Sequence, residues 1–302
     1  MQVKHLMRQM RIDCCLLKDK RELAIVDRYA RSARFVTLIL TTICYFGIVF
    51  FGIFQLLPLI LDYVSPLNES RPRRLFVITE YFVSQEKYFY AMVLHEALII
   101  CVGINALIGV LMMIVGYMLH SCALLKITSY RIENVLGSLS GSEKKDFLYK
   151  RMINMIVIHQ RATEFVNVLS SVFGRSFTML VFVGVTSTII NLLQLLQVVT
   201  SNNFGEASVV ALVTFTHFVY MFVINFYGQQ MINHGADLFR AFYNGMWYAA
   251  PLRTQKLLLF VMQKGILDVH LDVGGMFIAS LECFAALVSS TISYFTVIYS
   301  VR

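Results

Sequence analysis

Five stretches of this sequence are apolar and long enough to cross a lipid bilayer as helices, and no other feature restricts the fold as strongly. About 20 residues suffice for one span, because each residue advances a helix by about 1.5 Å. We expect the spans at residues 35–61, 90–119, 165–199, 208–227 and 274–300. A transmembrane barrel would instead show short segments of alternating apolar and polar residues. The sequence therefore predicts an all-α, polytopic helical membrane protein with five transmembrane helices.

The overall composition supports a membrane protein. Hydrophobic residues make up 58% of the 302 residues and charged residues 15%, whereas about 25% of the residues in ordinary soluble domains are charged. The net charge of +8 does not indicate a nucleic-acid partner, because the basic residues flank the apolar spans, where membrane topology accounts for them. The lipid bilayer is the first expected partner.

The distribution of basic residues predicts the orientation in the membrane. The connections on the amino-terminal side, residues 1–34, 120–164 and 228–273, hold twenty Lys and Arg residues, and the opposite connections hold five. Basic residues stay on the cytoplasmic side, so we expect a cytoplasmic amino terminus and an extracellular carboxyl terminus. Residues 1–34 would form a basic cytoplasmic segment ahead of a transmembrane domain over 35–302. The only glycosylation sequon begins at Asn68, in an expected outer connection.

The last span carries its small residues on one face. They recur at steps of four and three, at Ala279, Cys283, Ala286, Ser290, Ser293, Val297 and Ser300. In a membrane helix, such a stripe either packs closely against another helix or faces water. The spacing alone favours close packing.

Motifs for catalysis are absent from the sequence. The seven histidines do not follow a metal-binding spacing such as H-E-x-x-H, and no Gly-rich phosphate loop or G-x-S-x-G motif follows a strand. We therefore expect no enzymatic activity, no metal and no cofactor.

Aromatic and thioether side chains gather in the halves of the spans that we expect to lie outward. The candidates for an apolar ligand pocket are Phe50, Phe51, Phe54, Tyr90, Met92, His95 and Phe215. If these halves converge, they can hold a small hydrophobic ligand with few polar contacts. The alternative is ordinary packing against lipid and other helices. For His95 the alternative is a hydrogen-bonded pair with the adjacent Glu96 at the level of the lipid headgroups.

A series of carboxyl-terminal motifs resembles the insect odorant receptor family. The motifs occur in order and with family-like spacing: Tyr243-Asn244-Gly245-Met246-Trp247-Tyr248, Pro251, Lys256-Leu257-Leu258-Leu259-Phe260-Val261-Met262-Gln263, Gly274-Gly275-Met276-Phe277, Ser280-Leu281-Glu282-Cys283-Phe284 and Ser293-Tyr294-Phe295-Thr296. Ile158-His159-Gln160, ahead of the third span, is also similar to the family. The combination is specific, although each motif alone is weak.

The resemblance implies a ligand-gated, non-selective cation channel in the plasma membrane. In this family, an odorant-binding subunit forms a hetero-tetramer with a co-receptor subunit, and the terminal helix of each subunit lines one pore. The pore-lining positions fall on Ser293, Val297, Ser300 and Val301. Val297 occupies the hydrophobic gate position. We expect Ala279, Cys283 and Ala286 to pack in the inner half of this helix.

The resemblance also implies a cytoplasmic anchor between subunits within residues 228–273. Its candidate residues are Trp247, Lys256, Leu258 and Met262. The co-receptor type carries glutamine where Ser300 stands, so this chain resembles an odorant-binding subunit that detects small volatile hydrophobic molecules.

The family has seven spans, and we count five. The resemblance therefore implies that two further spans would precede Met1. Two other functions stay open on the residues alone. One is a transporter of a small amphiphile with His95, Glu96 and His217 on its path. The other is a non-conducting assembly protein.

Overall fold

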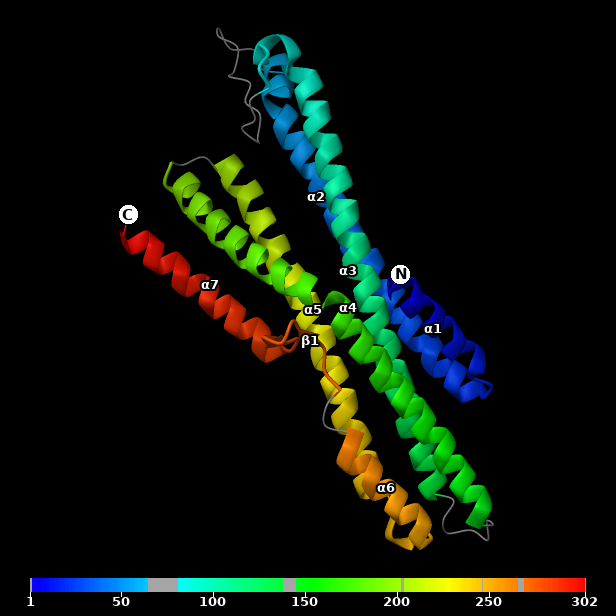
Figure 1. The fold of residues 1–302 in the computed structure, drawn as a ribbon. Coiled ribbons are helices and arrows are strands. Elements are labelled where there is room, and N and C mark those ends of the chain that lie inside the picture. Colours follow the sequence, from blue (N-terminus) through cyan, green and yellow to red (C-terminus); the bar gives the residue numbers. More distant parts are fainter. Residues whose placement is uncertain are drawn as a thin grey trace.

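The computed structural model describes residues 2–64, 81–137, 145–201, 204–245, 247–265 and 269–301. The elements in chain order are α1 (Gln2–Leu16), α2 (Lys20–Val64), α3 (Gln85–Gly137), α4 (Lys145–Thr200), α5 (Phe204–Asn244), the short 3₁₀ helix η2 (Trp247–Ala249), α6 (Leu252–Gly265), β1 (Asp272–Val273), β2 (Phe277–Ile278) and α7 (Leu281–Val301). Helices make up almost all of the described chain (Figure 1). Asn68, the expected glycosylation site, lies outside the described residues.

Among the described residues, five helices are long and apolar enough to cross a membrane: α2, α3, α4, α5 and α7. They confirm the predicted number of transmembrane helices and the all-α class. The helices extend well past the expected spans, since α4 alone has 56 residues. A helix of that length measures about 80 Å, whereas the hydrocarbon core of a bilayer is about 30 Å thick. The predicted spans 90–119 and 165–199 therefore mark only the apolar parts of α3 and α4.

The predicted start of the last span, at residue 274, is wrong. A short antiparallel hairpin pairs Asp272 with Ile278 and Val273 with Phe277, and α7 begins only at Leu281. Gly274 and Gly275 form the turn, with φ angles of +64° and +75°. A right-handed helix cannot pass through two successive residues with positive φ, and glycine adopts such angles at little cost.

The long helices pack together at one end of the bundle and diverge toward the other. Figure 1 shows the α2–α3 pair, the α4–α5 pair and α7 separating toward the end that holds the carboxyl terminus. We call the two parts the packed half (residues 2–40, 110–135, 150–180, 220–245 and 269–285) and the splayed half (45–64, 85–105, 182–215 and 288–301). Fully buried side chains such as Met118, Phe165 and Met231 fill the packed half. The core therefore lies there.

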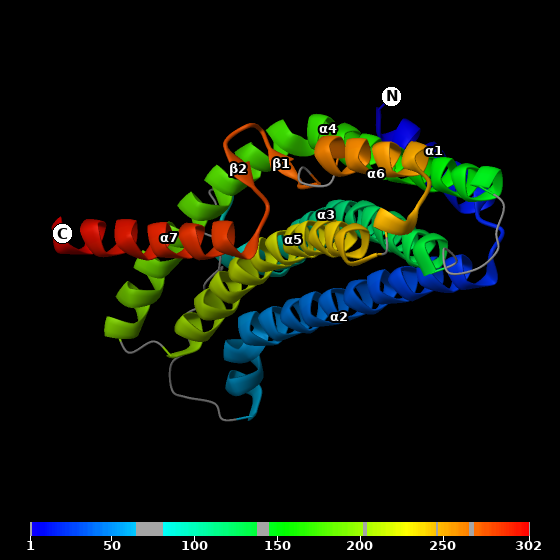
Figure 2. The same cartoon turned by 90° about the horizontal axis from the view of Figure 1, so that it is seen from below.

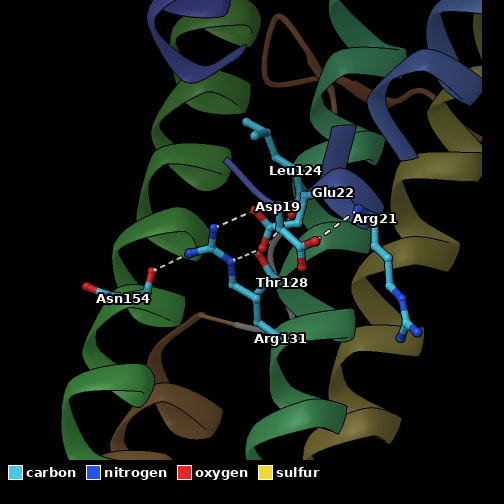
Figure 3. A network of polar contacts seen from close by, with 7 residues as sticks. All are labelled: Asp19, Arg21, Glu22, Leu124, Thr128, Arg131 and Asn154. Atoms are coloured by element: carbon cyan, nitrogen blue, oxygen red, sulfur yellow. Dashed lines mark hydrogen bonds and ion pairs between the residues drawn. The ribbon is translucent and has the colours of Figure 1, made fainter. Parts of the chain in front are cut away.

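Buried ion pairs connect the helices of the packed half. Figure 3 shows Glu22 of α2 against Arg131 of α3, whose Nη2 donates to Glu22 Oε2 over 2.8 Å. Arg131 Nη1 also donates to the carbonyl oxygen of Asn154 on α4. The Glu22 side chain is 5% exposed, and a charge so buried is tolerated when it is paired. This group therefore joins three helices.

A second buried carboxylate attaches α1 to the bundle. Asp13 Oδ1 accepts from Arg161 Nη1 of α4 over 3.3 Å, and Asp13 Oδ2 lies 3.4 Å from His120 Nε2 of α3. Figure 2 shows α1 and α6 along α4, on the opposite side of the bundle from α2.

Burial, and then the neighbouring Asp13 carboxylate, raises the pKa of the Cys14 thiol. The Cys14 side chain therefore stays protonated.

Candidate functional site

The first half of α7 is the part that packs against the rest of the chain. Leu287 is 7% exposed and Thr291 is fully buried one turn later. The Phe284 ring meets the Phe222 ring of α5 edge to face, with 5.5 Å between centroids. Because these residues lie on one face of the helix, α7 rests on α4 and α5 along a single edge.

The predicted pore residues lie on another face of α7. Ser293, Val297 and Ser300 are all exposed, with Val297 at 55%. Successive residues are offset by about 100° around a helix, which places this face about a third of a turn from Leu287 and Thr291. The Ser300 hydroxyl donates to the Val297 carbonyl oxygen over 2.8 Å. The side chain of Val301 lies outside the described residues.

The inner small residues of the last span are buried to different degrees within this chain. Ala279 is 1% exposed, but it precedes α7 and packs as part of the hairpin. Cys283 is half-buried, and Ala286 is exposed. Within this chain the bulkier Leu287 and Thr291 form the packed face of α7, and the packing expected for Ala286 stays a prediction.

Most of the predicted pocket residues whose side chains the structure describes are exposed within this chain. Phe50, Tyr90, His95 and Phe215 are exposed, Phe51 is half-buried, and Met92 is 5% exposed. The side chain of Phe54 lies outside the described residues.

His95 and Glu96 do not pair with each other. His95 Nδ1 lies 3.0 Å from the Tyr81 hydroxyl, whereas the Glu96 carboxylate accepts from Gln55 Nε2 of α2. Neighbouring residues on a helix point about 100° apart, so they meet different partners. Gln55 and Glu96 are both buried, at 7% and 6% exposure. A glutamine inside an apolar span was the available sequence signal for this contact.

An open hollow of about 410 Å³ lies along one face of α4 in the splayed half. Its lining residues are Phe182, Val183, Thr186, Ser187, Ile190 and Asn191. Ser187 Oγ lies 3.0 Å from His217 Nε2 on α5, which ties this face of α4 to its partner helix. Sequence reasoning missed the hollow, although polar residues three to five apart in an apolar span could have indicated it.

The predicted anchor residues divide between the core and the surface. Leu258 of α6 is 1% exposed and belongs to the core of the chain. Trp247 and Met262 are half-buried, and Lys256 is exposed. Leu252 and Leu259, also on α6, are 71% and 51% exposed. One face of α6 therefore holds it on its own subunit, and another presents apolar side chains outward.

Comparisons with known proteins agree on one family. The model of the family described as "7tm Odorant receptor" matches residues 1–292. Odorant receptor 49a of Drosophila melanogaster is 30% identical over 77 residues, which cover 26% of this chain. The match spans 19% of that curated relative, or about a fifth of its length.

Solved structures show the same fold. The insect olfactory receptor OR5 from Machilis hrabei in complex with eugenol is similar with a TM-score of 0.68 at 17% identity, covering 93% of this chain and 69% of that chain. A second OR5 structure gives a TM-score of 0.64 at 16% identity with the same coverage. The chain belongs to the insect odorant receptor family, a family of multi-pass membrane receptors and not of enzymes.

Proposed function

We propose that this chain is a subunit of an odorant-gated, non-selective cation channel in the plasma membrane. One observation carries the proposal: in a member of the odorant receptor family, α7 exposes Ser293, Val297 and Ser300 on a face that the described part of the chain does not cover. Hydroxyl groups gain little from contact with lipid tails, but they suit a wall that faces water. The family membership and this exposed face together support a pore.

In the proposed channel, the α7 helices of four subunits surround one pore. Val297 forms the hydrophobic constriction, which blocks ions by excluding water when it is narrow. Ser300 and Val301 lie near the pore mouth, and Ser293 lies one turn deeper than Val297. Ligand binding favours a conformation in which Val297 moves away from the axis, so that gating is a shift between two populations.

The charge distribution supports an orientation with the packed half toward the cytoplasm. Twenty of the basic residues lie in connections on the amino-terminal side, and basic residues remain cytoplasmic. Residues 1–34 and 228–273 are then cytoplasmic, and Asn68 and the carboxyl terminus are extracellular. The pore mouth near Ser300 opens outward in this arrangement.

The proposed ligands are small, volatile and hydrophobic. The OR5 receptor of similar fold was solved with eugenol, which is an aromatic molecule of that kind. For this chain, the apolar side chains of the splayed half support the same class of ligand. The pocket candidates remain Phe50, Phe51, Phe54, Tyr90, Met92, His95 and Phe215.

A co-receptor subunit is the proposed partner in the hetero-tetramer. Trp247, Lys256, Leu258 and Met262 are the proposed anchor residues. Lys256 contributes directly from the exposed face of α6, while Leu258 acts by fixing α6 on its own subunit, since its side chain is buried. The exposed apolar residues Leu252 and Leu259 support an interface on the outward face of α6.

The Val297 position tests the proposed pore. We expect Val297→Ala, expressed with the co-receptor, to raise the current in the absence of ligand by more than about twofold, because a smaller side chain weakens a hydrophobic constriction. Whole-cell recording in two cation solutions measures both the current and the selectivity. Ile292→Ala is the matched control, since Ile292 is 50% exposed on a different face of α7. Unchanged current and selectivity in Val297→Ala would contradict the pore assignment.

A further inference from the structure

Side chains of α5 hold the first backbone amides of α7. The Ser280 amide donates to Asn225 Oδ1 over 3.1 Å, and the Leu281 amide donates to Gln229 Oε1 over 3.3 Å. The first amides of a helix have no partner inside the helix and need one elsewhere. A third amide in this first turn, that of Cys283, donates to the Ser280 hydroxyl over 3.1 Å, so Ser280 caps the helix. The start of α7 is therefore fixed mainly by another helix.

The two acceptor groups on α5 are themselves held in place. The Asn225 side chain is buried, and its Nδ2 donates to the Met221 carbonyl oxygen over 2.9 Å. The Gln229 Nε2 donates to Asn233 Oδ1 over 3.0 Å. Each amide group therefore turns its oxygen toward α7, and the contact does not require ordering of a mobile side chain.

The same turn of α5 makes a backbone contact with the hairpin. A Cβ atom at Gly228 would lie 2.2 Å from the Ala279 carbonyl oxygen and 2.6 Å from its Cβ. Residues three and four apart share a helix face, so Gly228 lies on the same side of α5 as Asn225. A glycine is required there because only hydrogen fits between the two backbones.

The other side of the hairpin rests on α4. Ser170 Oγ accepts from the Asp272 amide over 3.2 Å, and the Thr178 hydroxyl lies 3.2 Å from the Val273 carbonyl oxygen and 3.0 Å from that of Gly174. A Cβ atom at Gly174 would lie 3.1 Å from the Gly274 nitrogen. The hairpin is thus enclosed between α4 and α5 at the level where α7 begins.

A small tilt at the start of α7 would produce a large displacement at its far end. Val297 lies sixteen residues after Leu281, or about 24 Å along the helix, and a tilt of about 10° at the start would move it by about 4 Å. The outer turns of α7 are mostly exposed, so few contacts within the described chain oppose that motion. The position of the gate then depends on the junction at residues 279–281.

We propose that Asn225 and Gln229 are gate-positioning residues: their amide oxygens bind the Ser280 and Leu281 amides and transmit movement of α5 to Val297. This inference rests on the proposed pore function. It identifies α5, which also carries the pocket candidate Phe215, as the helix that connects the splayed half to the base of α7.

Hydrogen exchange of the purified full-length chain tests the contacts directly. Gln229→Met and Asn225→Leu remove the acceptors with little change in size. We expect exchange of the amides in residues 279–284 to become about five- to tenfold faster, the usual effect of losing one such hydrogen bond. Gln229→Glu keeps an acceptor oxygen and should restore slow exchange at Leu281. Gln230→Met is the matched control, because the structure gives Gln230 no hydrogen bond to α7.

Current recorded with the co-receptor in the absence of ligand tests the transmission to the gate. We expect Gln229→Met to change this current at least twofold at equal surface expression, and Gln230→Met to leave it unchanged. Gln229 is half-buried, so its variant stays informative if Asn225→Leu fails to fold. Unchanged amide exchange in Gln229→Met would overturn the contact.

The comparison with Val297→Ala separates this inference from the proposed function. Faster exchange in Gln229→Met with unchanged current, while Val297→Ala alters the current, would overturn the transmission and leave the pore intact. Unchanged current in both variants would contradict the pore and the positioning role together.

Discussion

The packed half and the outer turns of α7 in the splayed half use polar groups in opposite ways. In the packed half, Asp13 and Glu22 are buried and each carboxylate bridges separate helices. In the splayed half, polar side chains such as Ser293 and Ser300 lie exposed on the helix surface. Helix α7 begins in the first environment and ends in the second. A fixed base with an uncovered end is suited to a helix whose outer part moves in gating.

The largest effect should come from breaking a buried ion pair of the packed half. We expect Arg131→Met to lower the free energy of unfolding by about 3–5 kcal/mol, because it leaves the Glu22 carboxylate buried without its cation. Thermal unfolding of the detergent-solubilised receptor measures the loss. Arg31→Met is the control, since the Arg31–Asp27 pair is well exposed on both sides and such pairs contribute at most about 1 kcal/mol. Equal losses in the two variants would contradict the assignment of the packed half as the stable core.

A smaller effect should come from the glycine beneath the hairpin. Gly228→Ala places a methyl group against the Ala279 backbone, and such overpacking costs about 1–3 kcal/mol. We also expect a changed current in the absence of ligand, because the base of α7 must shift. Gly184→Ala serves as the control: a Cβ atom at Gly184 meets nothing within 4 Å, and alanine favours the helix by about 0.8–1 kcal/mol. A Gly228→Ala protein as stable as Gly184→Ala would be inconsistent with the close contact.

The smallest changes in the free energy of unfolding should come from removing one tyrosine hydrogen bond in each half. Tyr29 Oη lies 2.8 Å from His234 Nε2 and is part-buried, whereas the Tyr45 hydroxyl donates to Asn105 Oδ1 over 2.8 Å at the surface. We expect Tyr29→Phe and Tyr45→Phe each to cost about 1 kcal/mol, because Tyr29 is part-buried and Tyr45 lies inside an apolar span, where lipid cannot replace the lost partner of Asn105. Unfolding of the two variants side by side gives the comparison. A Tyr45→Phe protein as stable as the unchanged chain would contradict the hydrogen bond between α2 and α3 inside the membrane.

The sequence was sufficient for the number of spans, the helical class and the family. These depend on long apolar runs and on local motifs, which each segment carries by itself.

Contacts between segments could not be read from the sequence. Gln55 meets Glu96 across 41 positions, and nothing local in either segment specifies that partner. The hairpin before α7 was missed because Gly274 and Gly275 lie beside an apolar run that resembles a helix. The packed face of α7 was missed for a related reason: small residues indicated close packing, while the chain packs Leu287 and Thr291 instead.

The pore assignment of α7 is the central claim, and cysteine accessibility tests it most directly. Ser293→Cys, Val297→Cys, Ser300→Cys and the control Ile292→Cys would each be expressed with the co-receptor and exposed to a charged, membrane-impermeant thiol reagent during recording. We predict that modification alters the current in the first three variants and leaves Ile292→Cys unaffected. Modification of Ile292→Cys alone, or no effect at Ser293, Val297 and Ser300, would contradict the account.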